Sequence, residues 1–178
     1  MARRISLRDF QQQLAKRLHE ASVSRFEHWL VLRAGGRRLL LPLTNATAIA
    51  DEFALATIPH APGGYRGLAN VRGNLVGVVD LGWLENGTET TLGKQSLLLV
   101  LAPRLIENTA LLLEETAGLR PMNAFTPAEN ESGIHPWHVR AYHSADDPEP
   151  WFLIDTARLV ADPLFFGITS PGRATVTP

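Results

Sequence analysis

The chain of 178 residues contains no cysteine, which excludes disulfides, zinc–thiolate sites and a cysteine nucleophile. It also lacks any uninterrupted apolar run of the roughly 18 residues that a bilayer-spanning helix needs. The basic start Met1-Ala2-Arg3-Arg4 is not followed by the apolar segment and cleavage site of a secretory signal. We therefore expect a cytoplasmic protein that is neither secreted nor inserted in a membrane.

The usual catalytic motifs are missing as well. The sequence has neither a Gly-x-Ser-x-Gly nucleophile elbow nor a Gly-x-x-x-x-Gly-Lys-Ser/Thr phosphate loop. The strongest enzyme candidate is the histidine group His135, His138 and His143, because imidazole is a common zinc ligand. In a strand over residues 137–143, however, His138 and His143 would face opposite sides. We expect no catalytic, cofactor or metal site, with a histidine-dependent metal hydrolase as the alternative.

The formal net charge of -1 is unevenly distributed along the chain. Residues 1–38 carry a net +6, and the rest of the chain carries -7. A basic arm on an acidic body is one signature of nucleic-acid binding. Here the basic residues are spread over a predicted helix and a hairpin without an aromatic stacking platform. We expect a solvated basic surface and no nucleic-acid partner.

An N-terminal helical extension is predicted for residues 1–28. Ser6 followed by Asp9 resembles a capping box, which covers the free N–H groups of a first helical turn. Apolar residues then recur at spacings of three and four, which predicts a helix over roughly residues 7–21 with one apolar face. That face packs either on its own domain or on a partner. The residues that form it are Leu7, Phe10, Leu14 and Leu18.

The sequence pattern of residues 29–165 predicts a mainly β domain. Two apolar runs around Gly35-Gly36 predict a hairpin, and a second hairpin is predicted to turn at Gly73-Asn74. Short strands separated by Gly/Pro turns indicate barrels or a sandwich, here in two halves with a polar connector at 86–95. The further strands are predicted at 96–102, 109–113, 116–120, 137–143 and 151–154, followed by a short helix from Asp155 that ends before Pro163 and a loose tail over 166–178.

One composite motif is distinctive: Gly67-Leu68-Ala69-Asn70-Val71-Arg72-Gly73, followed by an apolar strand that ends in Asp80-Leu81. It resembles the signature of CheW-like chemotaxis coupling proteins, a Gly-x-x-Asn-x-Arg-Gly turn before a strand ending in Asp-Leu. Ile58 to Pro62 resembles the proline-rich approach to that motif, and Leu111 to Thr116 occupies the place of a later family strand. The resemblance covers roughly residues 29–162, and it is greatest to the PilI branch of type IV pilus signalling.

The resemblance implies two intertwined five-stranded SH3-like barrels with a hydrophobic core between them, and neither enzyme activity nor a cofactor. It implies a bacterial cytoplasmic adaptor that is recruited to membrane receptor arrays. Such an adaptor bridges the cytoplasmic tip of a methyl-accepting chemoreceptor to the regulatory domain of a CheA-type histidine kinase. The output implied is control of twitching motility by type IV pili, with flagellar or other signalling as the alternative.

Six motif residues are expected to bind a partner or to hold the hairpin: Gly67, Asn70, Val71, Arg72, Gly73 and Asp80. A glycine at 73 permits a sharp turn, and Asn70 can fix the turn backbone by hydrogen bonds. Arg72 presents five donors for a carboxylate or carbonyl groups. The family often has an acid in its third strand, where this chain reads Ala46-Thr47-Ala48-Ile49, so Asp51 and Glu52 are the remaining candidates to pair with Arg72.

Overall fold

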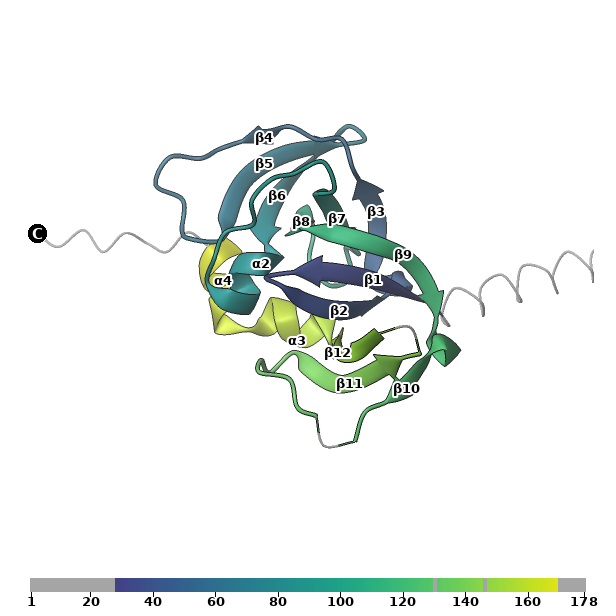
Figure 1. The fold of residues 1–178 in the computed structure, drawn as a ribbon. Helices are drawn as coiled ribbons and strands as arrows, with labels where there is room; N and C mark the ends of the chain where they lie inside the picture. The colour runs from purple at the N-terminus through teal and green to yellow at the C-terminus, as the bar shows by residue number, and fades with distance from the viewer. Residues whose placement is uncertain (1–27, 130, 146, 170–178) are drawn as a thin grey trace, which may run out of the picture.

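The computed structural model describes residues 28–129, 131–145 and 147–169. The predicted helix over 7–21 and most of the predicted tail lie outside these residues. Two six-stranded sheets make up the fold, with a few short helices (Figure 1). The fold is therefore mainly β, as predicted, although each sheet has six strands where five were expected. None of the helices in the described ranges is both long and apolar enough to cross a membrane.

The first sheet has the strand order β10-β11-β12-β2-β1-β9. It joins the beginning of the described chain to its end, because β2 pairs with β12 in parallel. In Figure 1, β1 and β2 accordingly lie across the middle of the molecule, next to strands that are far away in sequence. The strands are β1 (His28–Ala34), β2 (Arg37–Pro42), β9 (Glu115–Pro121), β10 (Phe125–Pro127), β11 (His138–Ser144) and β12 (Asp147–Ile154).

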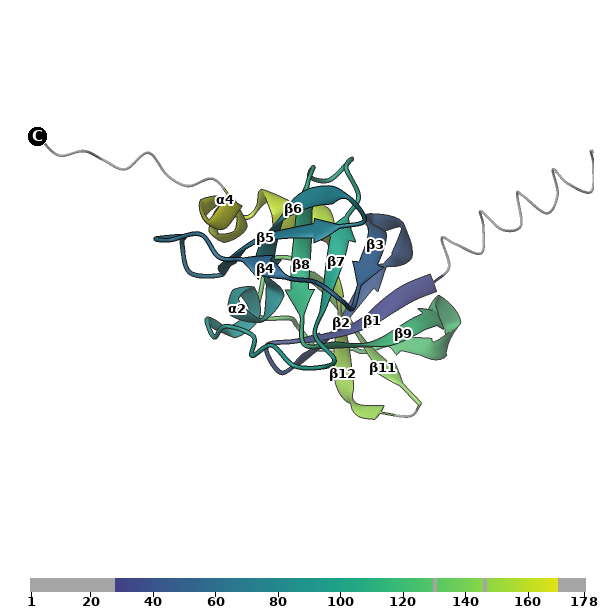
Figure 2. The same ribbon diagram turned by 90° about the horizontal axis from the view of Figure 1, so that it is seen from above.

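The second sheet has the order β3-β7-β8-β6-β5-β4, and it is seen from another side in Figure 2. All of its strands come from the continuous segment between β2 and β9. The sheet therefore interrupts the first one in sequence, which interlocks the two units. Its strands are β3 (Ala46–Ala50), β4 (Leu55–Ala56), β5 (Tyr65–Val71), β6 (Asn74–Asp80), β7 (Leu97–Leu101) and β8 (Thr109–Leu113).

Strands that are apolar on both faces belong to two cores at once. In β1, Leu30 and Leu32 face a large cluster shared by both sheets, whereas Trp29 and Val31 face an aromatic cluster inside the first sheet. In β8, Leu111 and Leu113 likewise pack in the shared cluster, whereas Ala110 and Leu112 pack in a smaller cluster formed by the second sheet alone. Since neighbouring strand residues point to opposite sides, a continuous apolar run fills both cores. Burying each such leucine contributes on the order of 2 kcal/mol.

Two short 3-10 helices and three α-helices connect and cover the sheets in the described ranges. They are η1 (Leu43–Asn45), η2 (Met122–Ala124), α2 (Leu81–Asn86), α3 (Thr156–Ala161) and α4 (Pro163–Thr169). The short helix predicted after Asp155 is present as α3, and the Asp155 carboxylate accepts hydrogen bonds from its first turn. The helices α2 and α4 were not predicted. Phe165 and Ile168 of α4 are buried in the shared cluster, so tertiary packing stabilises a seven-residue helix that is too short to be stable alone.

Candidate functional site

The motif hairpin turns at Arg72 and Gly73, one residue earlier than predicted. Val71 pairs with Asn74, and the two residues between them have φ angles of 53° and 87°. Two positive φ angles define a type I′ turn, whose twist matches that of the flanking strands. The Gly73 N–H donates a hydrogen bond to the Asn70 side-chain oxygen at 2.9 Å. This bond anchors the turn and fixes where the Arg72 side chain starts.

Arg72 is exposed at the tip of this hairpin. Within the described ranges it forms no ion pair, and neither Asp51 nor Glu52 supplies one. Its side chain borders a pocket of about 230 Å³ against η1 and β3. We call this pocket and its arginine the Arg72 socket, which is lined by Leu43, Ala46, Thr47, Ala48, Ile49 and Arg72.

Gly67 and Val71 hold the hairpin in the sheet. Gly67 has a φ of 118°, and a Cβ atom there would collide with the main-chain oxygen of Ala56 in β4. A side chain at this position would therefore separate β5 from its edge strand. Val71 is only 4% exposed and packs inside the second sheet. Neither residue presents a side chain to a partner.

Asp80, the last predicted motif residue, is fully buried at the start of α2. One oxygen accepts from the Arg66 guanidinium at 2.6 Å and from the Thr90 N–H at 2.7 Å. The other accepts from the Thr90 hydroxyl at 2.6 Å and from the Trp83 N–H at 3.2 Å, which caps α2. These hydrogen bonds offset the cost of removing the carboxylate from water, so Asp80 stabilises the interior of the domain and is not accessible to a partner.

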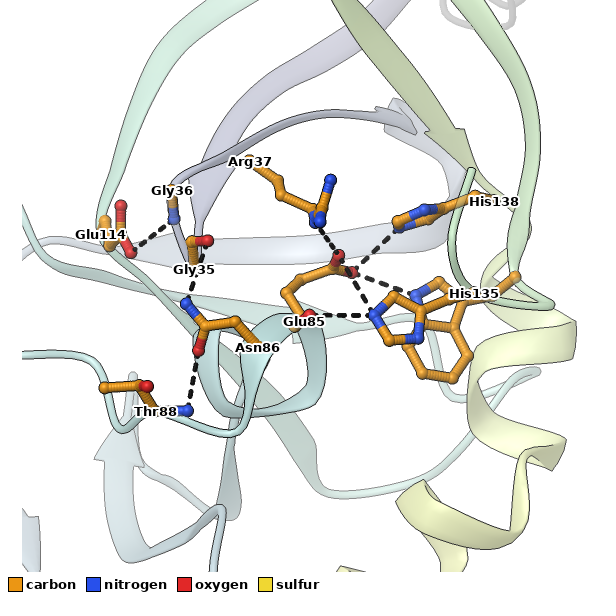
Figure 3. Close-up of polar contacts among 10 residues, drawn as sticks. Gly35, Gly36, Arg37, Glu85, Asn86, Thr88, Glu114, His135 and His138 are labelled. Carbon is orange, nitrogen blue, oxygen red and sulfur yellow. Dashed lines mark hydrogen bonds and ion pairs between the residues drawn. The ribbon is translucent and has the colours of Figure 1, made fainter. Parts of the chain in front are cut away.

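A second buried carboxylate, Glu85, was missed by the sequence analysis. Its Oε1 accepts hydrogen bonds from Trp137 Nε1 and His138 Nε2, both at 3.1 Å (Figure 3). Its Oε2 faces Arg37 Nε at 3.6 Å and His135 Nε2 at 3.7 Å, both too long for a hydrogen bond. We call these five residues the Glu85 junction. The signal in the sequence was a lone acid within the apolar segment Trp83-Leu84-Glu85.

The Glu85 junction joins the two sheets. Glu85 belongs to α2, which follows directly on β6 of the second sheet, whereas Arg37 and His138 belong to the first. Next to the junction, the Asn86 side chain donates to the Gly35 oxygen at 3.1 Å, in the turn between β1 and β2 (Figure 3). The Gly36 N–H donates to Glu114 at 3.3 Å. Helix α2 therefore contacts the first sheet through a charged side chain, Glu85, and a neutral one, Asn86.

The structure separates the histidines of the predicted enzyme candidate. His135 and His138 meet at Glu85, but His143 lies apart and contacts Glu131 at 3.3 Å. Across the described ranges, no group of three or more histidines and carboxylates is arranged to hold a metal ion. His138 Nε2 must carry its proton to donate to a carboxylate, and His135 Nε2 does the same toward the Glu85 carbonyl at 3.0 Å. Both rings are structural donors.

Tyr65 at the start of β5 is half-buried, and this burial raises the pKa of its phenol above the ordinary value of 10.0. Its ring lines one hollow between the 58–62 loop and the end of α4, and a second hollow bordered by β5, β6 and Asn108. A phenol that is shielded from water loses solvation of its anion, so the neutral form is favoured.

Comparison with known proteins places this geometry in a family. The CheW-like domain model matches residues 28–163. A crystal structure of the scaffolding protein TtCheW from Thermoanaerobacter tengcongensis superimposes with a TM-score of 0.58 at 17% identity, covering 72% of this chain and 88% of that one. No curated protein sequence matches. The predicted CheW-like fold is thus confirmed, and the match over most of its length shows that this chain belongs to the CheW-like domain family.

Proposed function

We propose that this protein is a non-catalytic adaptor that couples a methyl-accepting chemoreceptor to a CheA-type histidine kinase. The observation that carries the proposal is the Arg72 socket on a CheW-like domain, where an exposed guanidinium that forms no ion pair with any described residue borders a largely apolar pocket. Such a surface can bind another protein, but it holds no nucleophile paired with a base. Of the two buried carboxylates, Asp80 accepts hydrogen bonds through both oxygens, and Glu85 accepts them from Trp137 and His138 through Oε1.

The partners proposed are the cytoplasmic tip of the receptor and the regulatory domain of the kinase. A helical tip lying in an apolar groove and edge-to-edge contact between β-rich domains are both established recognition modes. The similar structure TtCheW is described as a scaffolding protein, which supports the same role here. The adaptor would act in the bacterial cytoplasm, recruited to receptor arrays at the membrane.

The output proposed is twitching motility driven by type IV pili. It depends on the likeness of the motif region and of the predicted N-terminal helix to the PilI branch. Flagellar taxis or another signalling pathway is the second candidate. Deletion of the gene distinguishes them, because loss of twitching with normal swimming supports the pilus output and the reverse result contradicts it.

Reconstitution tests the coupling itself. Membranes carrying the receptor and a CheA-type kinase from the same genome are combined with and without the full-length protein, and kinase autophosphorylation is measured. An adaptor is expected to make the kinase rate respond to the receptor ligand, although it transfers no phosphate itself. A rate that is the same with and without the protein contradicts the proposal.

A further inference from the structure

Asn86 is the only asparagine in the chain that is followed by glycine. The amide carbon of an asparagine side chain, Cγ, can be attacked by the main-chain nitrogen of the next residue. Glycine has no Cβ to obstruct this approach, whereas every other asparagine of the chain precedes a residue with a side chain. Asn86 and Gly87 are both exposed, at the C-terminal end of α2. The sequence therefore favours this reaction at one position, and the fold leaves that position accessible to water.

In the closed form of α2 the attacking nitrogen is already engaged. The Gly87 N–H donates to the Trp83 carbonyl at 2.7 Å, which completes the last turn of the helix, and Gly87 has the positive φ of 75° that is typical of a helix C-terminus. The amide group that must leave is also held, because Asn86 Nδ2 donates to the Gly35 oxygen at 3.1 Å (Figure 3). Attack on Cγ requires the bond from Gly87 to break first. The closed last turn therefore slows the reaction.

Two features favour the reaction once the last turn opens. The helix has only six residues, so its own hydrogen bonds do not hold it, and its buried residues Leu84 and Glu85 lie before Asn86. The end of α2 can therefore open while the rest of the helix stays packed. The Thr88 N–H donates to Asn86 Oδ1 at 2.7 Å (Figure 3). This bond polarises the side-chain carbonyl and stabilises the negative charge that Oδ1 acquires during attack.

We propose that Asn86 is a site of spontaneous deamidation, and that opening of the last turn of α2 controls its rate. The Gly87 nitrogen loses its proton and forms a bond to Asn86 Cγ. The bond between Cγ and Nδ2 breaks, and the amide group leaves as ammonia, which takes up a proton equivalent to the one that Gly87 lost. Water then opens the cyclic imide and gives aspartate or isoaspartate. The net change consumes one water and releases one ammonia, so the step needs neither an oxidant nor a reductant.

The product has a negative charge where α2 contacts the first sheet. A carboxylate cannot donate a hydrogen bond to the Gly35 oxygen, so it repels the oxygen that the amide group binds. The adjoining hollow of about 410 Å³ is already lined by the carboxylates of Glu89 and Glu114, which a third negative charge also repels. Because the ammonia is lost to the solvent, the change is not reversed. Deamidation therefore releases the end of α2 from the turn between β1 and β2, next to the Glu85 junction.

Peptide mapping by mass spectrometry tests the site. The full-length protein is incubated at mildly alkaline pH, either folded or in urea, and is then digested with trypsin. Cleavage after Arg72 and Lys94 gives one peptide that contains both Asn86 and Asn74, an exposed asparagine that is followed by leucine and serves as the matched control. Asn86 should convert faster than Asn74 in both states, and at least about tenfold faster in urea than in the folded protein.

The two comparisons test different parts of the proposal. Conversion of Asn86 in the folded protein that is no faster than conversion of Asn74 overturns the site. Equal rates for Asn86 in the folded protein and in urea overturn the control by helix opening.

A variant tests the consequence for the fold. Asn86→Asp reproduces one product, so it should lower the melting temperature and speed amide exchange at Gly36 and Gly87 by roughly fivefold, the factor expected for one lost hydrogen bond. Asn74→Asp makes the same chemical change on the motif hairpin and should leave exchange at both glycines unchanged. Converted wild-type protein, separated by anion exchange through its added charge, should behave as Asn86→Asp does. Wild-type exchange and melting temperature in both Asn86→Asp and the converted protein overturn the release of α2.

Discussion

Replacing Glu85 with glutamine is expected to loosen the contact between the two sheets. The side chain is fully buried, and its carboxylate accepts two hydrogen bonds, from Trp137 and His138. Hydrogen bonds to a charged group contribute roughly 1.5–3 kcal/mol each, and removing one partner of a buried ion pair costs roughly 3–5 kcal/mol. A glutamine keeps one acceptor oxygen, and Arg37 is 32% exposed and retains solvent. We therefore expect a loss of about 3 kcal/mol.

Urea denaturation followed by tryptophan fluorescence measures this loss. For a chain of this size, about 3 kcal/mol corresponds to a fall of roughly 6–12 °C in melting temperature. Glu89→Gln makes the same chemical change at a carboxylate that is 58% exposed, and should stay within about 0.5 kcal/mol of wild type. Combining Glu85→Gln with His138→Phe should give a coupling energy of about 1 kcal/mol or more. Equal stability of Glu85→Gln and Glu89→Gln, or zero coupling, refutes the reasoning.

Three further outcomes are expected. Asp80→Asn should destabilise the protein by about 3 kcal/mol in urea, because it removes the fully buried carboxylate that pairs with the partly buried Arg66 guanidinium at 2.6 Å; a loss under about 1 kcal/mol contradicts this. Gly67→Ala should lower the free energy of unfolding by at least about 1 kcal/mol and speed amide exchange in β4, since the new Cβ would meet the Ala56 oxygen. Unchanged exchange would contradict a close contact between β4 and residue 67. The raised pKa of Tyr65 means that its contribution to stability is complete below pH 10 and falls as pH rises beyond it. The difference between the ultraviolet titrations of the wild type and Tyr65→Phe measures the pKa of Tyr65. A pKa at or below 10 contradicts this prediction.

Much of the architecture was predictable because its causes are local. The paired glycines at 35 and 36 have φ angles of 59° and 71°, the values that a tight hairpin needs, so the first turn was predicted correctly. Asp155 likewise marked the start of α3. Continuous apolar runs such as Leu97 to Leu101 predicted strands buried on both faces.

The remaining features depend on contacts between distant segments. Glu85 lies more than 45 residues before the rings that bind it, and nothing in its local sequence shows that His138 will be its neighbour. The motif turn was placed one residue late because Gly73-Asn74 has the composition of a turn, whereas the strand register makes Arg72 its first residue. The missing acid in β3 was predicted, but only the structure shows that Asp51 and Glu52 do not replace it.

The adaptor function is tested most directly by asking whether the full-length protein binds both partners at once. The measurement is sedimentation velocity of the protein mixed with a receptor cytoplasmic fragment and a kinase regulatory domain from the same genome. We expect a ternary species that disappears when the adaptor is omitted. Separate sedimentation of all three proteins, at concentrations well above those of the cell, would contradict it.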